Sequence, residues 1–396
     1  MRSLAAYKPI RHTLRASVPM KKRILTIFGS KDEAIKMAPV IHQLLQHPDR
    51  FSCQVCVTGK HAHLPDPNLP LFRIKPDYDL GIVHSDESRT STFRSILQGA
   101  KKVLEESRPD LVLVHGETST GLAASLAAFY QDIATGHIEA GLRTAADNGV
   151  RPNEMNNHAI SSLATCHFTH TEETKQNLVN EGIASDAIFV TGNTVIDSLL
   201  AAIRFLRTDS TIQTEIARRF YYLKPSKRLI LVTGHHHGHV GPGLEKICTA
   251  LKIIARNAPD IEIIYPVQME STGLKSARKL VQGSKRIHLV ESSAYLPFVW
   301  LMDRCSFIIS DSNTIQVKAP SLANPLLATC TITARPEAIS AGTARLVGVD
   351  PENIAKEALP FLSNRTSLKQ MSRFFNPYAD EPAVTRIVTF LPVARG

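Results

Sequence analysis

The chain has 396 residues with a formal net charge of +10, and 43% of its residues are hydrophobic and 21% charged. This composition is typical of a globular protein large enough for two domains, and it excludes a low-complexity or fibrous chain. No apolar run approaches the roughly 20 residues that a membrane-spanning helix needs, so we expect no membrane span.

Residues 1–20 carry four basic residues and no acidic one. We interpret this segment as a disordered basic leader, because the first predicted strand begins just after Met20, which could itself be the natural start. A basic arm that touches nucleic acid or membrane, or a transit peptide, is the competing interpretation. Elsewhere the basic residues are scattered, and an anionic small ligand explains them without a nucleic-acid partner.

Neither the cysteines nor a histidine run predicts a metal site. Cys53 and Cys56 have CxxC spacing but lie in one strand-like segment with no second pair, so we expect the six cysteines to be reduced thiols of a cytoplasmic protein. The histidines at 235–237 and 239 have no cysteine or carboxylate at ligand spacing. Adjacent side chains of an extended segment also point to opposite faces, so these histidines cannot all converge on one ion.

The first half alternates short apolar strands with helices, which is the pattern of a parallel sheet. Strands are expected at 23–28, 51–58, 111–114, 133–138, 167–170 and 187–190, helices at 29–45, 92–107, 121–130, 153–163 and 171–182, and a long loop at 60–79. The turn at Gly29 opens a helix whose free N–H groups favour an anion, with Lys31 and Lys36 near its mouth. Ordinary exposed helix lysines are the alternative.

The segment from Leu111 to Thr144 predicts one complete strand–helix–strand unit. Glu117 and Glu139 fall at the carboxyl ends of its two strands, where open α/β sheets bind ligands. That position makes both residues candidates for acid–base chemistry rather than solvated surface charges.

The second half repeats the pattern. Strands are expected at 228–233, 261–265, 288–290, 306–310, 325–328 and 345–347. Helices are expected at 245–256, at 295–301, from 351 onward and after 380, and a strand-to-helix turn at 311–316. His235 follows the first of these strands, where a histidine facing the cleft would bind phosphate or transfer a proton. The predicted fold is α/β, with two Rossmann-like domains and a cleft between them. We expect a leader at 1–20, domains at 21–205 and 206–375, and a C-terminal helix at 376–396 that crosses back to the first domain.

Nine motifs stand in order between Lys21 and the C-terminus: FGSKDEAIKMAP, VLVHGETST, GHIEAGLRT, VTGNTVID, LVTGHHH, YLPFVWLM, SDSNTIQ, ARPEAISAGTARLVG and NPYAD. Together they resemble the non-hydrolysing UDP-N-acetylglucosamine 2-epimerases. The resemblance implies a glycosyltransferase-B-like arrangement, a homodimer, and a UDP-sugar held in the cleft.

The implied reaction interconverts UDP-N-acetylglucosamine and UDP-N-acetylmannosamine without a cofactor. UDP is eliminated to give a 2-acetamidoglucal and is added back after reprotonation at C2, which requires carboxylates near C2 and positive charge at the leaving diphosphate. By position in the motifs, Glu117, Glu139 and His235 are the implied catalytic residues. The implied substrate-binding residues are Lys31, Lys36, Glu154, Phe298, Asp311, Ser312, Asn313, Thr314, Lys318 and Arg335.

The chain departs from the family pattern within these same motifs. Glu117 stands where the family has an aspartate, Asn153 where it has a carboxylate and Asn157 where it has an arginine. Asn313 and Thr314 replace glycines, and Lys318 replaces the carboxylate that would accept the ribose hydroxyls. Two hypotheses follow. The chain is a diverged epimerase, or it is an impaired or repurposed paralogue that binds a different anionic or nucleotide-linked ligand or a protein partner.

Overall fold

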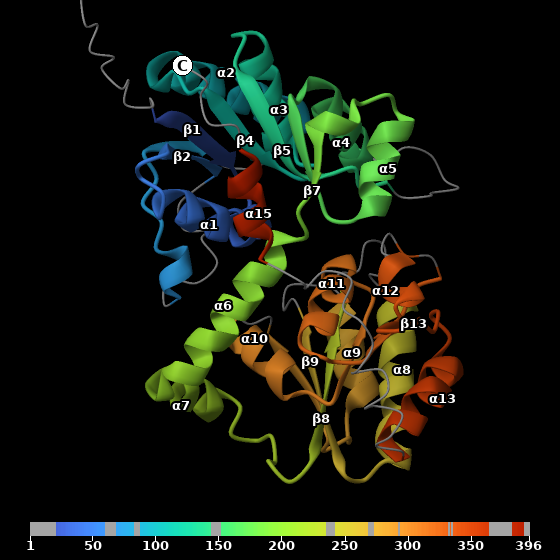
Figure 1. Ribbon diagram of the computed structural model, residues 1–396. Helices are drawn as coiled ribbons and strands as arrows, with labels where there is room; N and C mark the ends of the chain where they lie inside the picture. Colours follow the sequence, from blue (N-terminus) through green and yellow to red (C-terminus); the bar gives the residue numbers. More distant parts are fainter. Residues whose placement is uncertain are drawn as a thin grey trace, which may run out of the picture.

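The computed structural model describes residues 21–59, 69–82, 88–143, 152–234, 242–267, 273–291, 294–331, 333, 336–363 and 382–391. In these parts the chain forms two α/β lobes, which lie one above the other in Figure 1 with one long helix running between them. This arrangement confirms the predicted fold class.

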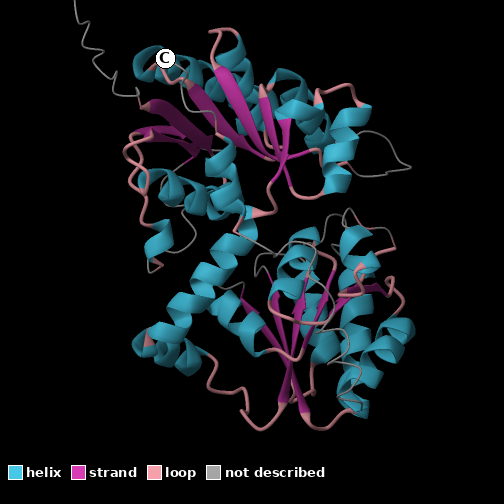
Figure 2. Ribbon diagram, in the orientation of Figure 1, coloured by secondary structure: helices cyan, strands magenta, loops and turns pink. Residues whose placement is uncertain are grey.

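The N-terminal lobe is built on a seven-stranded parallel sheet of order β3-β2-β1-β4-β5-β6-β7. Its strands are β1 (Lys22–Phe28), β2 (Phe51–Gly59), β3 (Tyr78–Ile82), β4 (Leu111–His115), β5 (Ala134–Ala140), β6 (Cys166–Thr169) and β7 (Ile188–Val190). Apolar side chains of α1 (Lys31–Leu45) and α15 (Ala383–Phe390) cover one face of the sheet. Those of α2 (Arg89–Ser107) and α3 (Ser119–Phe129) cover the other face (Figure 2). Helices α4 (Pro152–Leu163) and α5 (Glu172–Asn180) and the short turns η2 (Pro70–Phe72) and η3 (Ser185–Ala187) complete the lobe.

The C-terminal lobe repeats this plan with a six-stranded parallel sheet of order β10-β9-β8-β11-β12-β13. Its strands are β8 (Arg228–Thr233), β9 (Ile261–Val267), β10 (Ile287–Glu291), β11 (Phe307–Ser310), β12 (Leu326–Ala328) and β13 (Ala344–Leu346). One face packs against α8 (Pro242–Asn257), α9 (Gly273–Val281) and α13 (Pro351–Ser363). The other packs against α10 (Tyr295–Arg304) and α11 (Asn313–Ser321), near α12 (Pro336–Ser340).

Helix α6 (Thr194–Thr208) runs between the lobes and is followed by α7 (Ser210–Arg219). Its buried residues belong to one hydrophobic cluster that contains Ile35 and Ala38 of α1 as well as Tyr295 and Val299 of α10. The two lobes therefore share a core along this helix. The expected boundary at residues 205 and 206 falls within α6.

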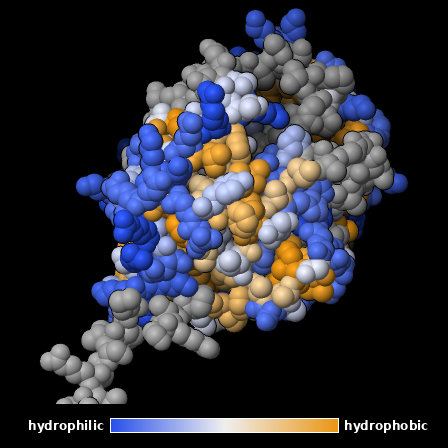
Figure 3. All heavy atoms as spheres, turned by 90° about the horizontal axis from the view of Figure 1, so that it is seen from above, coloured by the Kyte–Doolittle hydropathy of each residue, from blue (hydrophilic) through white to orange (hydrophobic). Residues whose placement is uncertain are grey.

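The upper surface of the N-terminal lobe is partly apolar. Figure 3 views this surface from above and shows hydrophobic residues gathered in its middle, between hydrophilic ones. Phe129 and Tyr130 at the end of α3 are 55% and 76% exposed, and their rings meet edge to face with centroids 5.8 Å apart.

The elements that were not predicted from the sequence include β3 and α9. The strand β3 lies at the edge of its sheet, and the alternating burial of its short YDLGI sequence gives no continuous apolar run. The helix α9 is short, but its sequence does carry a signal: Thr272 precedes it, and Leu274, Ala277 and Val281 recur at helical spacing. Neither element changes the fold class.

Candidate functional site

The site is organised around Glu139, near the carboxyl end of β5. Ile138 pairs with Phe168 and Ala140 pairs with Thr169, so Glu139 is the extra residue of a β-bulge between β5 and β6. Its φ is +65°, which is uncommon for a residue with a side chain. A bulge redirects a side chain at the end of a strand, and strained backbone of this kind is concentrated at functional sites.

Three nitrogen-bearing side chains surround the Glu139 carboxylate, which is only 6% exposed. The ammonium group of Lys36 on α1 donates a hydrogen bond to Oε2. His115 Nε2, at the end of β4, lies 3.2 Å from the same oxygen, and His170 Nε2 lies 3.5 Å from Oε1. The resemblance indicated Lys36 and Glu139, and the structure brings them into contact. It gave no role to the two histidines.

His115 adds no positive charge beside this carboxylate near neutral pH. Burial is the main reason that the pKa of His115 falls to about 3, with Lys36 lowering it further and Glu139 opposing the shift. Near neutral pH His115 is therefore uncharged. The Asn193 side chain lies 3.4 Å from His170 Nδ1, and an amide that donates there leaves the imidazole proton on Nε2, facing Glu139. Lys36 is thus the positive charge that balances the carboxylate among the described residues around it.

A second buried carboxylate fixes the turn that carries Lys36. Glu33 accepts hydrogen bonds from the backbone N–H groups of Gly29 and Ser30, at 3.1 and 2.8 Å, and from the Thr118 hydroxyl at 2.7 Å. Ser30 caps the helix in return, so a capping box joins the start of α1 to the start of α3. Glu117 lies beside Thr118 in this turn. Burial raises the pKa of Glu33, and these hydrogen bonds oppose that shift.

The C-terminal lobe contributes a lysine to the seam between the lobes. Lys318 of α11 is 6% exposed, and its ammonium group lies over the Tyr295 ring, 5.4 Å from the centroid. Phe72 of the N-terminal lobe meets the same tyrosine edge to face at 5.2 Å. From across the seam, Asp32 of α1 raises the pKa of Lys318 and Lys36 of α1 lowers it.

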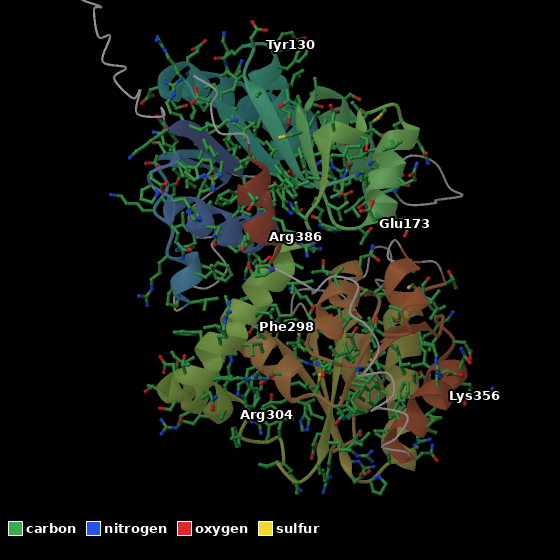
Figure 4. The ribbon with its side chains drawn as sticks, in the orientation of Figure 1. Tyr130, Glu173, Phe298, Arg304, Lys356 and Arg386 are labelled. Atoms are coloured by element: carbon green, nitrogen blue, oxygen red, sulfur yellow. The ribbon has the colours of Figure 1, made fainter. Side chains whose placement is uncertain are left out.

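The remaining predicted residues are distributed around this seam. Lys31 is exposed in the first turn of α1, whereas Glu117 and Glu154 are half-buried. Ser312, Asn313 and Thr314 lie where β11 passes into α11, just after Asp311. Phe298 is half-buried on α10 and packs against the shared core (Figure 4). His235 and Arg335 lie outside the described residues.

Some residues that form the surroundings of the site could not be identified from their position in the motifs alone. His115, His170, Glu33 and Tyr295 act through burial and contacts between elements distant in sequence. The one signal that pointed to two of them was their place at strand ends, since His115 and His170 stand at or just after the last residues of β4 and β6.

Two absences hold for the part of the chain that the structure describes. There, no three His, Cys, Asp or Glu side chains are grouped so that they could hold a metal ion. No helix in the same ranges combines the length and hydrophobicity that crossing a bilayer requires.

The chain was then compared with known proteins. The family model described as UDP-N-acetylglucosamine 2-epimerase matches residues 43–392. A probable UDP-N-acetylglucosamine 2-epimerase of Ralstonia nicotianae is 45% identical, over 92% of this chain and 97% of its own length. The UDP-N-acetylglucosamine 2-epimerase of Escherichia coli strain K12 is 44% identical, over 93% of this chain and 98% of its own length.

Solved structures agree. The UDP-GlcNAc 2-epimerase of Neisseria meningitidis bound to UDP-GlcNAc superimposes with a TM-score of 0.86 at 40% identity, covering 93% of this chain and 99% of that one. The Methanocaldococcus jannaschii enzyme in complex with UDP-GlcNAc and UDP gives a TM-score of 0.77 at 26% identity, covering 93% of this chain and 99% of that one. By sequence and by structure, this chain belongs to the UDP-N-acetylglucosamine 2-epimerase family.

Proposed function

We propose that this chain interconverts UDP-N-acetylglucosamine and UDP-N-acetylmannosamine by elimination and re-addition of UDP. The observation that carries the proposal is the Glu139 carboxylate, which is buried at a strand end, accepts a hydrogen bond from Lys36 and lies close to His115 and His170. A carboxylate fixed in this way is suited to exchange a proton with carbon at a single position. Relatives that are 40% and 26% identical carry UDP-GlcNAc in their structures, which supports the same ligand class here.

We assign the roles from the family motifs and from the contacts of Glu139. Glu139 exchanges the C2 proton, with Lys36 holding the carboxylate ionised and in place. Glu117 is the second carboxylate, which returns a proton from the other face of the glucal. The diphosphate lies toward the start of α11, where Ser312 makes no side-chain cap and the first N–H groups of the helix stay available to an anion. We keep His235 as the third catalytic residue, which contacts phosphate or transfers a proton, and we assign Arg335 to substrate binding and Phe298 to contact with the uracil base.

The structure accommodates one of the departures from the family pattern, the asparagine at position 157. Asn157 is fully buried, and its side-chain oxygen accepts a 2.8 Å hydrogen bond from Arg143. Arg143 also forms a two-pronged pair with Glu181, both contacts at 2.6 Å. A guanidinium therefore remains beside the position where an arginine was expected. The described residues give no support to the alternative of a repurposed binding protein.

Proton exchange at C2 tests the proposal directly. Purified protein is incubated with UDP-N-acetylglucosamine in heavy water and followed by NMR. Deuterium at C2, together with the manno product, is the expected result, because the carbon must lose and regain a proton. Intact, undeuterated substrate after long incubation at high protein concentration would refute the epimerase activity.

Further proposals concern assembly and compartment. We propose a homodimer that uses the apolar upper face around Phe129 and Tyr130, because isolated monomers rarely expose neighbouring aromatic rings to this extent. Sedimentation velocity should give a dimer for the unaltered chain and a monomer for Phe129→Asp/Tyr130→Asp. A dimer in both proteins would place the interface elsewhere.

All six cysteines are free thiols, which supports a reducing compartment such as the cytoplasm.

A further inference from the structure

The ammonium group of Lys318 is buried, and it has no counter-ion among the residues that the structure describes. Among the described residues no carboxylate lies within ion-pair distance of its ammonium group, and its one close partner is the neutral Tyr295 ring. The Tyr295 hydroxyl is itself buried, and no described residue forms a hydrogen bond with it. Burial of an unpaired charge is costly, so the position favours a ligand that supplies the missing negative charge.

The location of Lys318 restricts where that ligand would bind. Lys318 and Tyr295 come from the C-terminal lobe, and Phe72, Asp32 and Lys36 face them from the N-terminal lobe. Lys36 in turn contacts Glu139. Lys36 is therefore close enough to influence the charge of Lys318 and is also the hydrogen-bond partner of the candidate catalytic carboxylate. This places Lys318 on the same side of the seam as that carboxylate's partner.

The charges around Lys318 also determine what it can bind. Asp32 attracts a positive charge but is exposed on α1 and forms no ion pair with Lys318, whereas Lys36 repels it. Burial is the main cause that lowers the pKa of Lys318 to about 8, and the two α1 residues act in opposite directions. An anion bound at this seam would restore the charged form, since a nearby negative charge raises the pKa of an amine.

We infer that Lys318 is a ligand-binding residue that contacts the diphosphate of the nucleotide and makes binding of the ligand dependent on pH. This inference rests on the proposed function for the identity of the ligand. An ammonium group is a compact point charge with three donors, which matches a phosphate oxygen and offers no acceptor to a sugar hydroxyl. In this chain, the positive charge of Lys318, inside the seam between the lobes, thus helps to select the ligand.

The experiment measures UDP affinity by titration calorimetry at pH 7, 8, 9 and 10, for the unaltered chain and for Lys318→Met. At pH 7 the substitution should weaken UDP binding about tenfold to a hundredfold, the usual effect of removing a charge-assisted hydrogen bond. The ratio of the two affinities should then shrink by up to about tenfold per pH unit above pH 8, as the free lysine loses its proton. Using the ratio cancels the titration of UDP itself.

Three controls make the result specific. Lys318→Arg stays charged throughout this range, so its affinity relative to Lys318→Met should not fall above pH 8. Lys356→Met removes an exposed lysine of α13 on the outer side of the C-terminal lobe (Figure 4), and it should bind UDP as the unaltered chain does. Uridine lacks the diphosphate and should bind Lys318→Met and the unaltered chain equally well.

Several outcomes would overturn the inference. These are equal UDP affinities at every pH, tighter binding by Lys318→Glu, an equal loss of uridine and UDP affinity, or no UDP binding by the unaltered chain. Exchange at C2 is measured separately on the same samples. Exchange without an effect of Lys318 would leave the epimerase standing, whereas UDP binding that needs Lys318 without exchange would leave only the binding role.

Discussion

A chain carrying Glu139→Gln is expected to exchange the C2 proton of UDP-N-acetylglucosamine about 10²- to 10⁴-fold more slowly than the unaltered chain. Glutamine keeps the size of the side chain but cannot accept a proton at neutral pH. It also leaves the Lys36 ammonium without its carboxylate. Measurement of deuterium incorporation by NMR under single-turnover conditions gives the rate of this step directly.

Glu262→Gln is the matched control for this substitution. Glu262 of β9 is also buried, 3% exposed, and it is also paired with a histidine and a lysine, His288 at 2.7 Å and Lys227 at 3.6 Å. It lies near the amino end of its strand, away from the ends that bind ligands. Both variants should lose stability by similar amounts, and only Glu139→Gln should lose exchange. Equal loss of exchange would show that a buried carboxylate matters here for folding and not for chemistry.

The second large effect is expected at Gly141, which follows the bulge of Glu139 by two residues. A β-carbon at this position would lie 2.2 Å from the backbone oxygen of Thr174, and the φ of +78° also disfavours a side chain. Because the obstructing atom belongs to the backbone, α5 would have to shift to make room. Gly141→Ala should therefore lower the free energy of unfolding by about 2–4 kcal/mol, as measured by urea denaturation.

The Gly182→Ala variant separates the cost of backbone strain from the cost of a steric clash. Gly182 has a similar φ of +88°, but a β-carbon there would meet nothing within 4 Å. Its substitution should cost about 1 kcal/mol, the cost of the left-handed backbone alone. If both alanine variants were equally stable, the packing of α5 against Gly141 would not contribute to stability as the structure indicates.

The sequence predicts the architecture well because the lobes follow local rules. Apolar runs such as Leu111–Val114, each ending in a turn that opens a helix, predict parallel strands with ligand-binding ends, and the structure confirms this fold. The edge strand β3 was not predicted, because exposed and half-buried residues alternate along it and its sequence has no continuous apolar run.

The site was predictable only in part, for a different reason. Glu139 and Lys36 stand in recognisable motifs, but their contact joins residues 103 positions apart. The surroundings of Lys318 depend on Tyr295 and on two residues of the opposite lobe, so its burial cannot be read from the SDSNTIQ motif that precedes it. A bulge at Glu139 likewise requires the register of β6, which no local pattern supplies. These are properties of contacts between distant segments.

The shared hydrophobic core along α6 has a consequence for how the molecule unfolds. Val195, Leu199 and Ala202 pack in one cluster with side chains of both lobes, so neither lobe can lose its structure without exposing apolar surface of the other. The two lobes therefore form one thermodynamic unit rather than two independently melting domains. A fragment cut near residue 205 would end inside this helix, and the apolar side of its last turns would face water.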